Sequence, residues 1–147
     1  MIQISQVSSK LLKDKAYLAL LPEYYELATV TENNLWHDNQ NVLDHVIGVF
    51  AGLETVLIFK EFNTQQLAKV NNYLSESISN KTRRDILKIA TLLHDIAKTD
   101  VLIQQSDGMT VCPGHELIAS GRVSKFSKRF GLDTQSELYV ERIVRYH

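Results

Sequence analysis

The chain has 147 residues, enough for one domain whose hydrophobic core needs no disulfide staples. It is 44% hydrophobic and 22% charged with a formal net charge of −1, so no overall charge draws it to nucleic acid or to an anionic membrane. The single cysteine excludes an internal disulfide, no apolar run approaches the ~20 residues that span a bilayer, and the first residues lack a secretory signal. We therefore expect a cytoplasmic protein with one domain over residues 1–147.

Apolar residues recur at helical spacing between only 6 glycines and 2 prolines, which predicts an all-α fold, a compact bundle of about six to seven helices. In the N-terminal half we expect a helix over about 9–21 that ends at Pro22, a short helix from about Glu23, and a polar, loop-like stretch over 31–40. Asn41 is the expected N-cap of a long helix to about Lys60. The inward face of that helix is predicted to carry Val42, Val46, Val49, Phe50, Leu53, Val56 and Leu57.

A further helix is expected over about 64–77, and a capping box at Thr82–Asp85 opens a central, buried helix that runs through the apolar segment 86–93 into His94. Residues 99–114 are expected to connect it to the next helix, with a turn at Ser106–Gly108. The helix that follows covers about His115–Phe130 and ends at Gly131, with Ile118, Ala119 and Phe126 on its inner side. A second capping box at Thr134–Glu137 opens the last helix, whose apolar positions are Leu138, Val140, Ile143 and Val144.

The segment Ile89–Lys98 carries the most informative pattern, because His94, Asp95 and Lys98 interrupt a nearly all-apolar helix. Burying an imidazole, a carboxylate and an ammonium is costly without partners, and a metal ion would compensate most economically. The dipeptide alone is equally compatible with a His–Asp pair in a helix-packing network. The chain also holds a second copy, His37–Asp38, in the loop-like stretch.

Three other histidines occupy positions that favour a shared site. His45 lies between Val42 and Val49 on the inward stripe of its helix, where a core histidine satisfied by a hydrogen bond is the alternative. His115 opens a helix, where the macrodipole favours the neutral ring, although a surface residue in the first turn would look the same. His147 continues the apolar face of the last helix, and the alternative is a frayed terminal side chain.

The order of these residues resembles the HD superfamily of metal-dependent phosphohydrolases, and most closely the helical HD domains found alone in bacteria or beside nucleotidyltransferase or poly(A) polymerase domains. The resemblance covers about residues 36–147 and implies an HD-domain-like bundle. Four segments carry it: Asn41–His45, Leu92–Lys98, Gly114–Glu116 and Arg142–His147.

The resemblance implies that His45, His94 and Asp95 bind a divalent metal ion (Mg, Mn, Zn, Ni or Fe) and that Asp95 bridges to a second ion. His115 and His147 match the histidines of that second ion, and Lys98 matches a basic residue that faces substrate phosphate. Asp95 and Lys98 are thus the expected catalytic residues.

The chain departs from the family pattern after His147, where relatives usually supply a closing aspartate from a further helix. A missing C-terminal helix is the favoured explanation, with Asp38 or Asp44 as substitute ligands or an incomplete first site as the alternatives. Ala97 stands where many relatives have glycine, which a helix tolerates.

The function favoured by these residues is hydrolysis of a nucleotide or other small phosphate ester by a metal-activated water. The alternatives are an HD-type di-iron oxygenase, which uses the same residues, and a catalytically degenerate nucleotide-binding or interaction module. The expected partner is a small phosphorylated substrate, with no membrane involved; nucleic acid is possible but the charge does not indicate it, and the sequence leaves the oligomeric state open. Trp36 and His37 could line the pocket mouth, although core packing is the stronger expectation for Trp36, and Cys112 has no predicted role.

Overall fold

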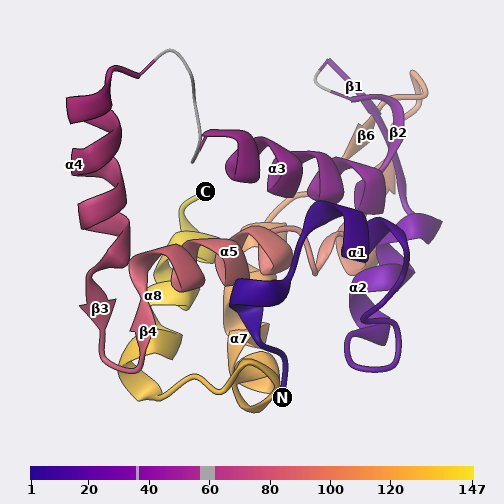
Figure 1. Ribbon diagram of the computed structural model, residues 1–147. Helices are drawn as coiled ribbons and strands as arrows, with labels where there is room; N and C mark the ends of the chain where they lie inside the picture. The colour runs from indigo at the N-terminus through magenta and orange to yellow at the C-terminus, as the bar shows by residue number, and fades with distance from the viewer. Residues whose placement is uncertain (36, 57–61) are drawn as a thin grey trace.

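The computed structural model describes residues 1–35, 37–56 and 62–147 and shows an all-α bundle, as expected, to which small two-stranded hairpins are added (Figure 1). The helices are α1 (Ser9–Lys13), α2 (Pro22–Glu26), α3 (Val42–Val56), α4 (Thr64–Ser75), α5 (Arg83–Leu93), α6 (Lys98–Val101), α7 (His115–Phe130) and α8 (Thr134–Arg145), with 3-10 turns η1 (Ile4–Gln6) and η2 (Leu27–Thr29). The antiparallel hairpins pair β1 (Thr31–Asn34) with β2 (His37–Asn41), β3 (Ser77–Ile78) with β4 (Lys81–Thr82), and β5 (Ile103–Gln104) with β6 (Thr110–Val111).

Helix α5 is the centre of the bundle, as its apolar sequence predicts. It packs against α3 and α8, and α7 packs in turn against α8 (Figure 1). The side chains of Ile89, Leu92 and Leu93 are at most 1% exposed, as are Phe50 of α3 and Phe130 of α7. Burial of such side chains is the main source of stability, at about 1.5–3 kcal/mol each. The core therefore fixes the relative positions of α3, α5, α7 and α8.

Local sequence signals set most helix ends. Thr82 and Asp85 form the predicted capping box of α5, and the Asn41 side chain accepts a hydrogen bond from the Asp44 backbone N–H at 2.8 Å. Gly131 ends α7 in the left-handed conformation with φ 64°, which glycine adopts without strain. The predicted capping box at Thr134 is wrong, because Asp133 caps α8 instead. Its carboxylate both accepts the Ser136 N–H and suits the positive end of the helix dipole.

Three stretches differ from the predicted secondary structure. The first helix ends at Lys13 rather than near Leu21, and Lys15 already has a left-handed φ of 56°. The polar stretch 31–40 is not a loop but forms most of the β1–β2 hairpin, and the connection 99–114 contains α6 and the β5–β6 hairpin. Short polar strands lack the apolar alternation that identifies a half-buried strand in a sequence.

Several apolar residues expected on inner faces are exposed. The exposed fractions are 40% for Val49, 37% for Ile118, 48% for Leu138 and 36% for Ile143, whereas Val46, Ala119, Val140 and Val144 are buried as expected. Helix α4 ends at Ser75, slightly before the predicted end. Trp36, Leu57 and the expected helix end near Lys60 lie outside the described residues.

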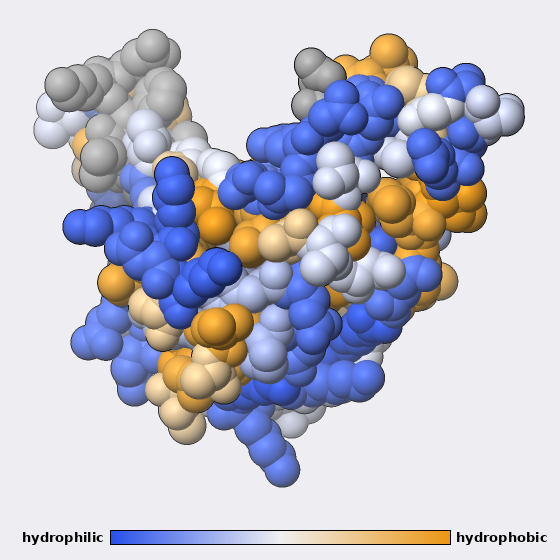
Figure 2. All heavy atoms as spheres, turned by 90° about the vertical axis from the view of Figure 1, so that its right-hand side faces the viewer, coloured by the Kyte–Doolittle hydropathy of each residue, from blue (hydrophilic) through white to orange (hydrophobic). Residues whose placement is uncertain are grey.

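The surface agrees with a core enclosed by the bundle. On the face shown in Figure 2, hydrophilic residues predominate and hydrophobic residues gather in separate patches. Within the described part of the chain, no helix combines the length and the apolar character needed to cross a membrane.

Candidate metal centre

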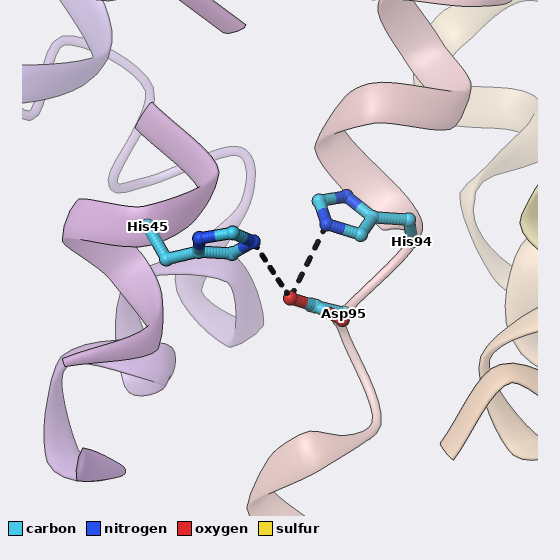
Figure 3. A group of neighbouring side chains, drawn as sticks. All are labelled: His45, His94 and Asp95. Carbon is cyan, nitrogen blue, oxygen red and sulfur yellow. Dashed lines mark ion pairs between the residues drawn. The ribbon is translucent and has the colours of Figure 1, made fainter. Parts of the chain in front are cut away.

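The His94–Asp95 pair lies where the helix is interrupted and not inside one continuous helix, which corrects the prediction. Helix α5 ends at Leu93, His94 is its C-cap, and α6 begins only at Lys98. Turn hydrogen bonds from Ile96 N to Leu93 O and from Lys98 N to Asp95 O bridge the break. The carboxylate of Asp95 is directed into the molecule and is 1% exposed (Figure 3). The segment between the two helices thus carries a buried charged group.

Four imidazoles from different elements converge on the two oxygens of Asp95. Oδ2 lies 3.6 Å from Nε2 of His45, on α3, and 3.2 Å from Nε2 of His94 (Figure 3). Oδ1 lies 3.3 Å from Nε2 of His115, at the start of α7, and 3.8 Å from Nε2 of His147, which follows α8. The structure therefore brings together the five residues predicted as metal ligands. They form two triads that share Asp95: His45–His94–Asp95 and Asp95–His115–His147.

Three of the imidazoles are oriented by the same local contact. The Nδ1 atoms of His94, His115 and His147 lie 2.8, 2.7 and 2.8 Å from the backbone carbonyl three residues earlier in the chain. A carbonyl only accepts hydrogen bonds, so Nδ1 carries the proton and the lone pair of the neutral ring is on Nε2. That lone pair faces a carboxylate oxygen, an arrangement that calls for a cation or a proton between them. Histidines that bind metals show this orientation by a backbone carbonyl.

The burial of Asp95 supports the fit to a cation. Neither of its oxygens accepts a hydrogen bond of regular geometry from the described residues. Burial raises the pKa of Asp95, but the imidazoles of His115 and His94 and the charge of Lys98 together lower it by more than burial raises it. The carboxyl is therefore ionised. Burial also lowers the pKa of His45 to about 4, which keeps this ring neutral. The hydrogen-bonding contact with Asp95 raises the pKa of His115. One carboxylate with imidazole nitrogens is a donor set for divalent zinc, iron or nickel.

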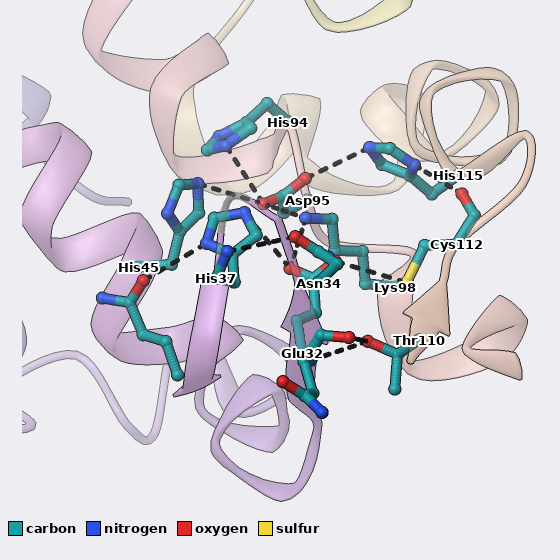
Figure 4. Close-up of polar contacts among 12 residues, drawn as sticks. Glu32, Asn34, His37, His45, His94, Asp95, Lys98, Thr110, Cys112 and His115 are labelled. Atoms are coloured by element: carbon teal, nitrogen blue, oxygen red, sulfur yellow. Dashed lines mark hydrogen bonds and ion pairs between the residues drawn. The ribbon is translucent and has the colours of Figure 1, made fainter. Parts of the chain in front are cut away.

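Lys98, expected to face substrate phosphate, is more deeply buried than a residue that contacts a phosphate at the protein surface. It is 6% exposed, and its Nζ lies 3.0 Å from Asp95 Oδ2 and 2.7 Å from Glu32 Oε2 (Figure 4). Burial lowers its pKa, but the Asp95 and Glu32 carboxylates raise it more, so the amine remains protonated. The ammonium group therefore bridges two buried carboxylates.

The β1–β2 hairpin contributes Glu32, which the sequence did not single out as a site residue, and His37, which was expected only at the pocket mouth. Glu32 is 4% exposed, and the ring of His37 stacks edge-on against His45 with centroids 4.5 Å apart (Figure 4). Nε2 of His37 lies 3.7 Å from Glu32 Oε2. The sequence signals for His37 were the repeated His–Asp dipeptide and its place just before the His45 helix, whereas Glu32 had none.

Of the carboxylates considered as substitutes for a closing aspartate, Asp44 does not reach the centre. Its side chain is exposed and bonds to Asn41 in the first turn of α3. The Asp38 side chain lies outside the described part of the structure. The Cys112 thiol lies 3.7 Å from Glu32 Oε1, and burial with the nearby Glu32 charge raises its pKa to about 11, so it remains a thiol.

An apolar cleft of about 290 Å³ opens beside both triads. Val49, Leu87, Ala90, Thr91 and Ile143 line it, and His94 and His147 form its edge. The exposure of Val49 and Ile143 follows from this cleft, because both side chains face it rather than the core. The cleft offers an apolar group a place next to the candidate metal ligands.

Comparison with known proteins gives one relative. Over 129 residues the chain is 27% identical to the bifunctional uridylyltransferase/uridylyl-removing enzyme of Cereibacter sphaeroides. The match covers 88% of this chain and 12% of that enzyme, so the chain spans only a small part of its length. No protein-family model and no solved structure match. The chain is thus distantly similar to a segment of a nucleotidyl-handling enzyme.

Proposed function

We propose that this protein is an HD-type, metal-dependent phosphohydrolase that cleaves a phosphate ester of a nucleotide or another small molecule. The convergence of four imidazoles on one buried carboxylate, in the order His45, His94–Asp95, His115, His147, carries the proposal. The similar enzyme of Cereibacter sphaeroides is named for the removal of a uridylyl group as well as for its transfer, and removal of a nucleotidyl group supports the same reaction class.

The residues would divide the work as follows. His45, His94 and Asp95 would hold one divalent cation, and Asp95, His115 and His147 a second. Such ions polarise a phosphoryl oxygen and lower the pKa of a bound water to near neutrality. The protonated Lys98 offsets part of the negative charge of Asp95 and Glu32 behind the centre, which lessens the repulsion of a phosphate anion. The apolar cleft beside His94 and His147 would receive the apolar part of the ester.

The test combines metal content with hydrolysis. The protein and its His94→Ala and Asp95→Ala variants are purified without chelator, and their metal is measured by elemental analysis. Each is then assayed with 4-nitrophenyl phosphate and with the 4-nitrophenyl ester of uridine 5′-monophosphate, which separates monoester from diester cleavage. We expect the full content of divalent metal and hydrolysis in the wild type only, with metal reduced in His94→Ala and lost in Asp95→Ala. Equal metal content in all three proteins would overturn the proposed centre.

With the second triad present, the two triads together also suit a di-iron centre. This is the alternative in which the same residues serve an oxygenase. The assays distinguish the two functions. Iron at two ions per chain, oxygen consumption with a reductant and no ester hydrolysis would favour the oxygenase. Little metal at His45, His94 and Asp95 together with neither activity would favour a nucleotide-binding or interaction module, and a stoichiometric divalent ion there would exclude it.

A further inference from the structure

The Lys98 ammonium group lies between two buried carboxylates that come from distant parts of the chain. Its Nζ is 3.0 Å from Asp95 Oδ2 and 2.7 Å from Glu32 Oε2, and Glu32 precedes Lys98 by 66 residues. All three residues are at most 6% exposed. One positive charge is therefore shared between two negative charges in a region that water barely reaches, where charge interactions are strong.

The oxygen that Lys98 approaches is also the metal-facing oxygen of the first triad. Asp95 Oδ2 is 3.6 Å from His45 Nε2 and 3.2 Å from His94 Nε2. A divalent cation held by this triad and the Lys98 ammonium group would then compete for one carboxylate oxygen and repel each other. Lys98 by itself opposes metal binding at this position.

Glu32 is held firmly where it can offset that competition. Its Oε2 accepts from Lys98 and lies 3.7 Å from His37 Nε2, and its Oε1 lies 3.7 Å from Cys112 Sγ. The next residue, Asn33, is tied to the β5–β6 hairpin by a 2.7 Å hydrogen bond from its N–H to Thr110 Oγ1. The Glu32 carboxylate is thus a fixed counter-charge in direct contact with the Lys98 ammonium group.

We propose that Glu32 is a positioning residue for the metal centre: it holds the Lys98 ammonium group so that Asp95 Oδ2 can accept a divalent cation together with His45 and His94. This inference rests on the proposed function only in that the triad binds metal. The β1–β2 hairpin would thus enable the site formed by the helices to bind a cation.

The test is a double-variant cycle on metal affinity, measured on the full chain by titration calorimetry with Mn²⁺ and, separately, Zn²⁺. Glu32→Gln should weaken binding about 10–100-fold, the usual effect of losing a residue that supports metal ligands. Lys98→Met should bind at least as tightly as the wild type. The double variant Glu32→Gln/Lys98→Met should recover the affinity of Lys98→Met, because the competing ammonium group is gone.

The recovery separates a positioning role from a structural one. If Glu32 only stabilised the hairpin, removing Lys98 would not restore metal binding. Unchanged affinity in Glu32→Gln, or a double variant as weak as Glu32→Gln, would overturn the inference. Should Glu32→Gln fail to fold, weaker binding by Lys98→Met alone would overturn it equally.

Glu76→Gln is the matched control, since Glu76 is an exposed glutamate that pairs with Arg83 at 3.1 Å on the surface. It should bind metal as the wild type does. If the wild type itself binds neither ion, the proposed function fails, whereas binding that does not depend on Glu32 contradicts only the present inference.

Discussion

The two sides of the candidate metal centre are held in place by different means. On the helical side, the rings of His94, His115 and His147 are oriented by carbonyls three residues earlier in the same segment. On the hairpin side, Glu32 is held by an ion pair to Lys98, 66 residues later in the chain, and His37 by contacts with Glu32 and with the ring of His45 on α3. The helical side is fixed once the helices pack, whereas the hairpin side depends on charges that must meet in the folded chain.

This difference predicts how far the effect of a substitution extends through the structure. Loss of a core side chain should destabilise the whole bundle, and loss of a hairpin contact should loosen the site with a small effect on stability. Variants on each side test this difference, and Phe50, at the centre of the core, should be the most sensitive position.

Phe50→Ala should have the largest effect, a loss of about 3–5 kcal/mol in the free energy of unfolding, because it removes a fully buried ring from α3. Denaturant unfolding followed by circular dichroism measures it. The matched control is Leu35→Ala in the β1–β2 turn, whose side chain is 90% exposed and should cost under about 0.5 kcal/mol. Similar losses in both variants would contradict the division between the two sides.

Asp95→Asn should abolish tight metal binding, with affinity reduced at least about 100-fold, or about 2.7 kcal/mol, because both triads lose their only anionic ligand. Calorimetric titration with Zn²⁺ provides the measurement. Asp44→Asn is the control, since Asp44 is exposed and its side chain bonds to Asn41 at the start of α3. A comparable loss in Asp44→Asn would mean that the ligand set is misassigned.

Thr110→Val should cost about 1 kcal/mol, because the hydroxyl that links β6 to Asn33 of β1 is lost while the side-chain shape is kept. Amide hydrogen exchange should become faster in residues 31–35 and leave α5 unchanged. Thr55→Val, at an exposed position of α3, is the control. Faster exchange throughout the bundle would show that the hairpins are not separable from the helices.

Glu23→Gln should have the smallest effect, at most about 1 kcal/mol, because the Glu23–Arg129 pair is partly exposed and screened by solvent. The hydrogen bond from Arg129 lowers the pKa of Glu23 below its ordinary value of 4.5. The stabilisation is therefore complete above that value and is lost as the pH falls through the lower pKa of the folded state. Thermal unfolding of both proteins between about pH 3 and pH 7 should show that the difference in stability between wild type and variant vanishes at the acid end. A difference in stability that grows toward low pH would contradict the predicted direction of the pH dependence.

The helical side could be predicted from the sequence because its signals are local. Thr82–Asp85, Asn41 and Gly131 each specify a helix end within a few residues, and the apolar run of α5 identifies the buried helix. The five histidine and aspartate residues of the two triads stand out because a polar group on an apolar helix face is costly to bury without a partner. Their spatial convergence then follows from helix packing.

The hairpin side could not be predicted in the same way. Nothing near Glu32 indicates burial, because the residue that compensates its charge is Lys98, 66 positions later. The break after Leu93 was also missed, since the residues 94–98 have no glycine or proline to mark a helix end. Both features depend on tertiary contacts that override local preference.

The shared carboxylate of Asp95 has a further consequence for how the two triads fill. Each triad uses one oxygen of the same group, so a single negative charge must serve both positions. The first cation to bind withdraws electron density from the oxygen left for the second. The two dissociation constants should then be unequal, and occupancy should rise in two steps as metal is added, an anticooperativity that follows from this one side chain.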